Sequence, residues 1–392
     1  MENEFWLILI MYKEIIKYRK FEAVLCLLNK FGFPMHKVRK VLKNTRECSL
    51  DESISYLHSL KKDPGNSAIT DTKKELSKYD LQIVIPVFNS ASTIQTCIES
   101  VLKQKTKFSV LVNVIDDGST DDSAKIIKKI LKNNKIKSKI DVKYIHQKNQ
   151  GFSGARNRGL ESIEGKYIMF IDSDDMILPN TINNLLSYGI KNKSDIVEGS
   201  FDYFNSKRTW NGIHHLTRNN IDNLDLITGM PWGKIYKADL WEKVEFPKNY
   251  LFEDTIIKYL IASRAKKIST ISDVVYKYRK SKKSISFTSK TNIDSLDTFY
   301  VTKQCLEDCE KLNILYNEKL YNLTLEQMVV NDKRLRNFPK RIRLAVFTVS
   351  CNLIAKYFAD VRTNKDILKD IEKGIRQKNY SYFFVSTIEF KL

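Results

Sequence analysis

Three carboxylates, Asp172, Asp174 and Asp175, follow directly on a short apolar run at residues 167–171. The run is rich in β-branched and aromatic residues, which is typical of a buried strand. Ionised carboxylates at the end of a buried strand repel one another and cost desolvation energy unless a cation or strong hydrogen-bond donors compensate them. The cluster is therefore either the N-cap of a following helix or a ligand set for a hard divalent cation, because Mg²⁺ and Mn²⁺ favour carboxylate oxygens.

A second acidic cluster, at residues 116–122, follows another apolar run. Residues 120–122 of this cluster would serve well as a helix N-cap. A cap needs only one such residue, however, and two or three acids stand close together at both places. This surplus favours a functional role for Asp172 and Asp174, whereas for residues 117–119 alone a structural role remains equally open.

The segment NQGFSGARNRG, residues 149–159, has the residue types needed to hold phosphate groups. Its glycines permit close approach of the backbone, and Arg156 and Arg158 can pair with phosphate oxygens. As a dinucleotide-binding fingerprint the segment fails, because the glycine spacing is wrong and no acid ends the next strand to bind a ribose in the usual way. A nucleotide diphosphate held through a metal ion fits these residues better.

These motifs need a scaffold that brings them together, and the hydrophobic pattern predicts one. Strands are expected at residues 81–87, 109–115, 142–145 and 166–171, with helices between them at 92–103, 121–133 and 153–163. Alternating strands and helices predict an α/β fold with a mostly parallel central sheet covered by helices. Ligands of such folds bind outside the carboxyl ends of the strands, where both acidic clusters fall.

Helical regions flank the α/β part of the chain, which we expect at residues 81–300. Residues 1–62 show helical periodicity and form an N-terminal extension, and residues 63–80 are polar and turn-rich, as in a linker. Residues 301–392 are again helical and include a basic cluster at 333–343. The helical flanks could form a homo-oligomer, bind lipid or hold a substrate.

The chain of 392 residues is 42% apolar and 29% charged, as expected for a globular protein, and its net charge is +20. Such a charge implies an anionic partner: nucleic acid, an acidic membrane surface or a phosphorylated ligand. No nucleic-acid partner is expected, because no helix-turn-helix, zinc or RNA-binding signature appears. No stretch approaches the ~18 to 20 apolar residues of a membrane helix, and the N-terminus lacks the pattern of a signal peptide. The six cysteines have no metal-binding spacing, so we expect a reduced, cytoplasmic protein.

Motifs spread over residues 81–287 resemble those of the inverting family 2 glycosyltransferases: IVIPVFN, VIDDGSTDDS, NQGFSGARNRG, FIDSDD, PWGKIYKADL, LFEDTIIKYLI and YKYRKSKKSISF. The resemblance implies a GT-A fold, a Rossmann-like nucleotide-diphospho-sugar transferase domain, at residues 81–300. It also implies a UDP-sugar donor, Mn²⁺ or Mg²⁺ as cofactor, and a glycan or lipid-linked acceptor in bacterial surface polysaccharide or glycoconjugate synthesis. A lipid-linked acceptor would place the enzyme in the cytoplasm, peripheral to the inner face of the cell membrane.

The same resemblance assigns one set of residues to the donor. Those expected to line the base and ribose are Pro86, Val87, Phe88, Asn89, Asp116 and Asp117. Asp116 is expected at a uracil edge, and Arg156 is expected to steady the nucleotide and its phosphates. In the DxD motif, Asp174 is the expected direct metal ligand, Asp172 reaches the ribose or the metal, and Ser173 belongs to the nucleotide side.

On the acceptor side, the resemblance makes Asp254 the catalytic base and places Glu253 and Trp232 near the acceptor sugar. Taken alone, Glu253 and Asp254 could be the acid pair of a helix N-terminus, and Trp232 could be a buried core residue. The metal-binding histidine often expected after the base is not evident, and residues 276–279 occupy that region.

Two other functions fit parts of the sequence. A nucleotidyltransferase that activates a sugar phosphate would need a Gly-rich loop with Arg or Lys after the first strand, and PVFNSAST has neither. A non-catalytic GT-A-like domain that binds a glycan or a partner protein would have no need for Asp172, Asp174 and Asp254. The two basic segments, 277–283 and 333–343, are either solvated surface or a contact with anionic lipid.

Overall fold

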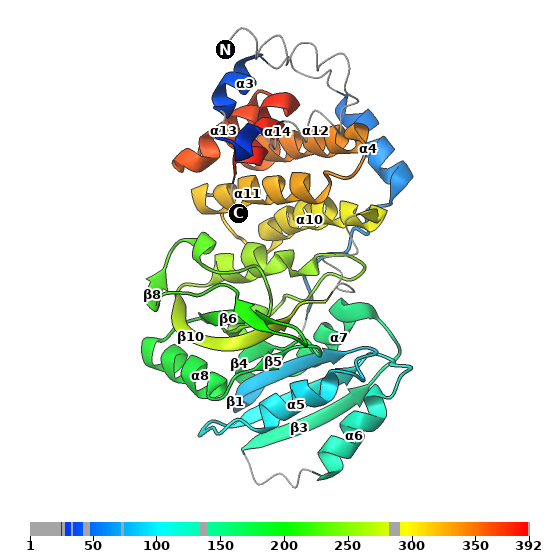
Figure 1. Cartoon of the computed structure of the whole chain (residues 1–392), viewed down its shortest axis with the longest axis vertical. Coiled ribbons are helices and arrows are strands. Elements are labelled where there is room, and N and C mark those ends of the chain that lie inside the picture. Colours follow the sequence, from blue (N-terminus) through cyan, green and yellow to red (C-terminus); the bar gives the residue numbers. More distant parts are fainter. Residues whose placement is uncertain are drawn as a thin grey trace. The chain divides into compact units, whose positions relative to one another are not determined.

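The computed structural model describes residues 25, 28–32, 34–41, 48–71, 74–133, 139–281 and 291–390. It divides into two compact units (Figure 1): a helical unit made of Met1–Lys62 and Tyr316–Leu392, and an α/β unit made of Asp63–Leu315. Part of the last sequence motif, residues 282–287, lies outside the described residues. All residues assigned to the donor and acceptor sides lie in the α/β unit.

The first half of the central sheet is parallel and has the strand order β3-β2-β1-β4. Its strands are β1 (Lys74–Val87), β2 (Val110–Asp116), β3 (Ile140–His146) and β4 (Ile163–Phe170). The helices between them are α5 (Ile94–Leu102), α6 (Ser123–Asn133) and α7 (Gly151–Leu160). β2 is buried along its whole length, as its continuous apolar run requires in a sheet covered on both faces. The expected α/β fold and the order of these elements are confirmed.

Alternate residues of β1 point to opposite faces of the sheet, so β1 packs against two different sets of helices. Leu81 and Ile83 belong to a core shared with α5, α6 and α8 (Thr181–Asn192). Gln82 and Val84 face α7, and the Nε2 of Gln82 donates to the carbonyl of Gly159 at 2.7 Å. A Cβ on Gly159 would lie 2.4 Å from Val84 Cγ1, so only glycine lets α7 approach the sheet this closely.

The second half of the sheet is mixed and continues in the order β9-β6-β10-β5. Its strands are β5 (Met176–Ile177), β6 (Ile196–Phe204), β7 (Thr209–Asn211), β8 (Arg218–Ile221), β9 (Lys234–Lys237) and β10 (Ile268–Arg279). β9 is antiparallel to both β4 and β6, whereas β6 and β10 are parallel to each other. β7 and β8 add antiparallel pairs on β6 and β10. The mostly parallel sheet expected from the sequence therefore holds for its first half only.

The segment predicted to be a linker, residues 63–80, is an integral part of the α/β unit. β1 already begins at Lys74, and the chain before it is tied to α10 (Asp297–Lys311) by side chains. Asp63 pairs with Lys303 at 3.0 Å, and the amide of Ala68 donates to Asp308 Oδ2 at 2.7 Å. These polar contacts leave no hydrophobic periodicity in the sequence, which explains why the segment resembled a linker.

The boundary of the C-terminal region also differs from the predicted one at residues 300 and 301, because α10 belongs to the α/β unit. Short helical turns complete this unit: η1 (Leu224–Leu226), η2 (Ala238–Trp241), η3 (Glu253–Thr255), η4 (Ile257–Ile261), η5 (Ala262–Arg264) and η7 (Ile293–Leu296).

The helical unit combines the two ends of the chain. Its helices are α3 (Met35–Val41), α4 (Leu50–Leu60), α11 (Glu318–Arg334), α12 (Lys340–Tyr357), α13 (Asp366–Arg376) and α14 (Tyr380–Glu389). α4 packs against α12, and α3 packs against α14. α4 starts with a capping box, in which the Oγ of Ser49 accepts from the amide of Glu52 and the Glu52 carboxylate accepts from the amide of Ser49.

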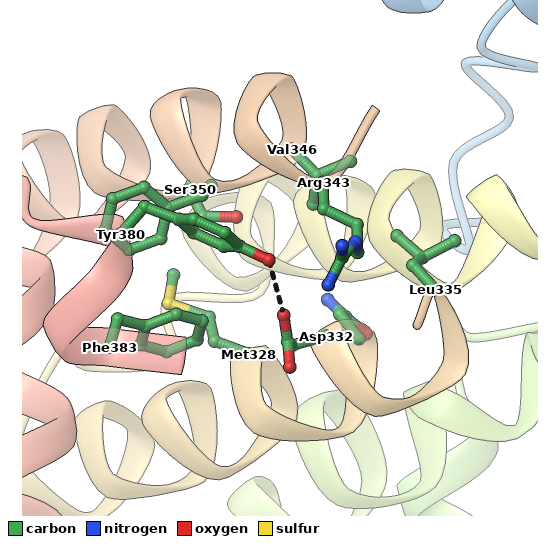
Figure 2. A pocket seen from close by; sticks show the side chains of 10 residues that line it. Met328, Asp332, Leu335, Arg343, Val346, Ser350, Tyr380 and Phe383 are labelled. Atoms are coloured by element: carbon green, nitrogen blue, oxygen red, sulfur yellow. Dashed lines mark hydrogen bonds between the residues drawn. The ribbon is translucent and has the colours of Figure 1, made fainter. Parts of the chain in front are cut away.

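The basic cluster at residues 333–343 lies partly inside the helical unit. Arg343 is buried and lines a cavity of about 20 Å³ with Asp332 and Tyr380, whose Oη donates to Asp332 Oδ1 at 3.3 Å (Figure 2). A cavity of this size has room for about one water molecule. The Nζ of Lys333 donates to a main-chain carbonyl of the last helix at 2.7 Å. Part of the cluster thus stabilises this unit instead of forming an open cationic face.

None of the helices in the described ranges has the length and apolar character needed to cross a membrane.

Candidate active site

The end of β1 offers one open aromatic side chain. Phe88 is 49% exposed and is available for stacking on a planar base. Asn89 has a positive φ of 47°, and its Oδ1 accepts from the amide of Thr120 at 2.8 Å. Asn89 therefore joins the β1 turn to the β2 turn. Val87 is buried in the sheet core, so it does not line the base as predicted, whereas Pro86 is half-buried at the strand end.

Asp116 ends β2 and is fully buried. Its Oδ2 accepts from Tyr144 Oη at 2.8 Å and lies 3.0 Å from His146 Nδ1, and its Oδ1 accepts from the amide of Ser119 at 3.0 Å. Burial acts to raise the pKa of Asp116, but these hydrogen bonds outweigh it and lower the pKa below its usual value. Both oxygens are occupied, so Asp116 braces the turn and is not placed at a uracil edge, contrary to the prediction.

Asp117 has the geometry that was expected of its neighbour. Its Oδ1 accepts from Gln147 Nε2 at 2.7 Å and from the amide of Gln150 at 2.9 Å. Its Oδ2 makes no hydrogen bond to any residue that the structure describes. The residue is 2% exposed, and Gln147 and the start of α7 fix the orientation of its carboxylate.

The turn after β4, which carries the DxD motif, is held by the end of β10. The buried carboxylate of Asp175 accepts from Tyr276 Oη at 2.8 Å and from the amide of Arg279 at 2.7 Å. Tyr276 Oη in turn accepts from the amide of Asp172 at 3.1 Å, and Arg279 Nε donates to the carbonyl of Asp174 at 2.6 Å. The third carboxylate of the cluster is thus structural, and it holds the other two in place.

Tyr276 and Arg279 had no predicted role beyond occupying the region where a histidine was expected. The signal in the sequence was an aromatic and a cationic residue three positions apart in a strand that follows the base. Their partners lie about 100 positions earlier in the chain, so no local pattern could reveal them.

Asp172 and Asp174 form a carboxylate pair suited to a divalent cation. Burial and the charge of Asp172 raise the pKa of Asp174 from 3.8 to about 6, which shows that a negative charge at Asp174 is poorly compensated by the protein alone. Within the described residues no group of three or more His, Cys, Asp or Glu side chains surrounds a metal position. Two carboxylates fit Mg²⁺ or Mn²⁺, since Mg²⁺ commonly takes one or two carboxylates with substrate phosphate oxygens and water. Ser173, between them, bonds Ser90 at 2.7 Å (Oγ–Oγ) and ties the turn to the β1 loop.

Arg156 of α7 connects this carboxylate pair to the predicted catalytic base. Its Nη2 donates to Asp172 Oδ1 at 2.9 Å, and its Nη1 donates to the carboxylate of Glu253. The guanidinium is 6% exposed and lies over the ring of Phe246, 5.2 Å from its centroid. Burial acts to lower the pKa of Arg156, but the two carboxylates raise it further, so the cation is secure. Both Nη groups of Arg156 are thus engaged by carboxylates, and its role in steadying the nucleotide and its phosphates stays a prediction.

Glu253 and Asp254 open η3, directly after Phe252 in the left-handed region (φ 67°). Burial raises the pKa of Glu253 from 4.5 to about 7, although Arg156 opposes the rise. The two acids differ: Glu253 is buried against Arg156, and Asp254 is half-exposed. Asp254 is thus the more accessible member of the pair, and its role as the base stays a prediction.

A buried cation lies below this acid pair. Lys234 is fully buried, 2.9 Å (Nζ–Oε2) from Glu198, and donates to Thr228 Oγ1 at 2.9 Å. Burial lowers the pKa of Lys234, while the charges of Glu198 and Asp254 oppose the fall. Asp254 thus interacts with a fixed positive charge from the protein interior.

Trp232 does not face an acceptor. It is 4% exposed and stacks on Tyr276 and Tyr278, with ring centroids 4.5 Å and 5.0 Å apart. Phe201 meets it edge-on at 4.9 Å. Of the two readings left open by the sequence, the buried core residue is the one that the structure supports.

The chain is similar to known sugar transferases. The family model "Glycosyl transferase family 2" matches residues 82–257. Glycosyltransferase GlyA of Streptococcus pneumoniae is 29% identical over 225 residues, which are 53% of this chain and 31% of that protein. Poly(ribitol-phosphate) beta-glucosyltransferase of Bacillus spizizenii is 30% identical over 209 residues, 50% of this chain and 32% of that protein. The match thus spans about a third of the length of each of these two relatives.

Among solved structures, residues 1–349 of S. aureus TarS in complex with UDP-GlcNAc have a TM-score of 0.60 and 21% identity, over 79% of this chain and 90% of that one. At this identity the likeness concerns the fold. The sheet order and the family match agree: residues 82–257 form a family 2 glycosyltransferase domain, and this part of the chain has the GT-A fold.

Proposed function

We propose that the protein is an inverting glycosyltransferase that moves a sugar from a UDP-sugar to a glycan or lipid-linked acceptor with the help of Mn²⁺ or Mg²⁺. The observation that supports this most strongly is the placement of Arg156, which bonds both Asp172 of the carboxylate pair and Glu253 beside the base. One side chain thereby joins the part of the site that would hold the leaving diphosphate to the part that would activate the acceptor.

Inversion requires one direct displacement, in which the acceptor hydroxyl attacks the anomeric carbon opposite the leaving diphosphate. In this proposal Asp254 accepts the hydroxyl proton as the new glycosidic bond forms, and the bond from carbon to the diphosphate oxygen breaks. Asp172 and Asp174 would hold the divalent cation, which stabilises the negative charge that develops on the diphosphate. Arg156 orients Asp172 and keeps Glu253 in place, so that Asp254 stands at a defined position beside the anomeric carbon.

The donor is proposed from two lines of support. At the carboxyl ends of β1 and β2, Phe88 offers an exposed ring that suits stacking on a base, and the buried Asp117 has one carboxylate oxygen that could accept from an N–H group. A fold neighbour, S. aureus TarS, is described in complex with UDP-GlcNAc and with UDP. We therefore favour a uridine nucleotide for this chain and leave the sugar to a donor screen.

The acceptor and the location in the cell belong to the same proposal. Relatives are named for poly(ribitol-phosphate) glucosylation and for minor teichoic acid biosynthesis, which favours a bacterial surface polysaccharide or glycoconjugate as the product. UDP-sugars are used on the cytoplasmic side, so we place the enzyme there, peripheral to the inner face of the membrane where a lipid-linked acceptor would lie.

Calorimetric titration with UDP tests the proposal directly. We expect binding in the presence of Mn²⁺, weaker binding with excess chelator, and loss of the Mn²⁺ effect in Asp174→Ala. Binding that chelator does not change would assign the diphosphate to the cationic side chains and remove the metal from the proposal. No binding of UDP under any condition would instead support a non-catalytic GT-A-like domain, which would also fail to hydrolyse UDP-sugars slowly in the absence of acceptor.

A further inference from the structure

Three half-buried aromatic side chains form a continuous surface on the second half of the sheet. Tyr203 of β6 is paired across the strands with Trp210 of β7, and their ring centroids are 5.8 Å apart. Tyr203 also meets Tyr278 of β10 edge-on at 5.9 Å. All three are partly exposed. We call Tyr203, Trp210 and Tyr278 the aromatic surface.

The aromatic surface rests on a rigid support. Tyr278 stacks on the buried ring of Trp232, which also stacks on Tyr276. Tyr276 is the residue that bonds Asp172 and Asp175 in the DxD turn. The orientation of the surface is therefore fixed by the same cluster that fixes the carboxylate pair.

Two exposed cations border these rings. Lys280 Nζ lies 4.3 Å from the ring centroid of Tyr203 and 4.8 Å from that of Tyr278. The guanidinium carbon of Arg208 lies 5.2 Å from the ring of Trp210. Neither cation forms an ion pair with a carboxylate among the residues described, and both remain open to solvent. Cations held over aromatic faces are pre-oriented at little entropic cost for an anion that arrives from solvent.

The aromatic surface lies in the half of the sheet that supports the DxD turn. Tyr278 and Lys280 are the neighbours of Arg279 in the chain, and Arg279 bonds the DxD turn at Asp174 and Asp175. Phe88 and Asp117, by contrast, follow β1 and β2 in the parallel half of the sheet. The aromatic surface and the residues suited to the base therefore belong to different halves of one sheet.

We infer that the aromatic surface binds the acceptor, and that the acceptor is a glycan with phosphate groups along its chain, whose sugar rings contact the exposed parts of Tyr203, Trp210 and Tyr278 while Lys280 and Arg208 pair with the phosphates. The inference rests on the proposed function and adds to it the chemical class of the acceptor. The apolar C–H faces of sugar rings suit aromatic side chains, and a repeated phosphate explains why exposed cations alternate with these rings. A neutral glycan could contact the rings but would have no anionic group to pair with Lys280 and Arg208.

The test compares two probes that share the same sugar but differ in the link between units: an oligomer of glucose units joined by charged phosphodiesters, and a neutral maltooligosaccharide with the same number of units. Binding to the full chain is measured by calorimetry at low salt and at 0.3 M salt. We expect the phosphodiester oligomer to bind at least tenfold more tightly than the neutral one and to weaken with salt. Trp210→Ala and the double variant Arg208→Gln/Lys280→Met should each weaken it at least tenfold, and Trp210→Phe should restore most of the affinity.

Lys207→Gln is the matched control, because Lys207 is an exposed cation of the same hairpin that is not next to a ring, and it should bind the oligomer like the unmodified protein. Equal binding of the two probes, or unchanged binding by Trp210→Ala and the double variant, would overturn the inference. UDP binding in the presence of Mn²⁺ is measured on the same preparations. If UDP fails to bind while the phosphodiester oligomer binds, the proposed transferase function is at fault; if UDP binds and the oligomer does not, the acceptor inference is at fault.

Discussion

Replacement of Arg156 by Met should reveal how strongly the two halves of the site depend on one guanidinium. The substitution keeps an unbranched side chain of similar length but removes the cation that lies between Asp172 and Glu253. Glu253 has a side chain only 8% exposed, so it loses its compensating charge in an environment that water barely reaches. Asp172, whose side chain is 26% exposed, can be solvated and should suffer less.

Breaking a buried ion pair by removing one partner typically costs ~3–5 kcal/mol. Glu253 can limit this loss by taking up a proton, since burial already raises its pKa to about 7 with Arg156 present. The folded variant would then bind a proton that the unfolded chain releases, so its stability falls as pH rises, by up to ~1.4 kcal/mol per pH unit. The unmodified protein also keeps a proton on Glu253 up to about pH 7, so the difference between the two proteins grows only above that pH. We therefore expect Arg156→Met to cost about 2 kcal/mol at pH 6 and about 3.5 kcal/mol at pH 8.

The assay is urea unfolding followed by tryptophan fluorescence, extrapolated linearly to water. Three of the four tryptophans, Trp210, Trp232 and Trp241, lie in the α/β unit, so the signal reports mainly on that unit. Glu253→Gln and the double variant Arg156→Met/Glu253→Gln complete a cycle. A coupling energy of about 2 kcal/mol or more is expected for residues in direct contact. A coupling below about 0.5 kcal/mol, or a loss independent of pH, would refute the view that Arg156 bridges the two acids.

Four further outcomes are expected. Asp254→Asn should reduce the rate of sugar transfer by ~10²–10⁴-fold while calorimetry shows UDP affinity within a factor of two, and a transfer rate close to that of the unmodified protein would assign the base elsewhere. Asp174→Asn in metal-free protein should raise the unfolding free energy at pH 8 by up to ~3 kcal/mol. The reason is that the Asp174 carboxyl has a pKa of about 6 in the folded protein, against an ordinary value of 3.8, and so destabilises the fold once it is ionised. The gain in unfolding free energy should shrink as the pH falls towards 4, and a gain that does not change with pH would contradict the reasoning. Lys234→Met should lower the unfolding free energy measured in urea by ~3–5 kcal/mol. Adding Glu198→Gln should restore part of this loss, and no restoration would show that the loss does not come from the broken ion pair between Lys234 and Glu198. Phe88→Ala should weaken UDP binding by ~1–3 kcal/mol without changing the urea midpoint, and unchanged affinity would exclude stacking on the base.

The parallel half of the fold could be predicted because its information is local. The strands around Ile83 and Val112 are mostly apolar runs, each with one buried amide side chain (Gln82 and Asn113), and the helices between them have clear apolar faces. The acidic turns at their ends followed from the rule that ligands lie outside the carboxyl ends of parallel strands. The mixed half gave no such signal, since β9 is only four residues long and takes its direction from β4 and β6 on either side.

For the site, the sequence indicated which residue types are present but not which role each residue has. Asp116 and Asp117 are adjacent and chemically identical, and only the positions of Tyr144 and His146 decide that the first is fully engaged. Likewise, the sequence allowed Arg156 to bind phosphate. In the structure its Nη1 donates instead to Glu253, 97 positions away, so that Arg156 links Glu253 to Asp172. Side-chain partners at such separation depend on tertiary packing, which no short motif records.

The helical unit has a consequence for how the chain is made. Its α3 and α4 leave the ribosome early, but their packing partners α14 and α12 are synthesised only after the whole α/β unit, roughly 340 and roughly 280 residues later. At a synthesis rate of ~5–20 residues per second, the early helices wait for roughly 15–70 s with their apolar faces uncovered. The helical unit can therefore fold only after α12 and α14 have been synthesised. A chain that ends before them would leave the apolar faces of α3 and α4 exposed to protein quality control.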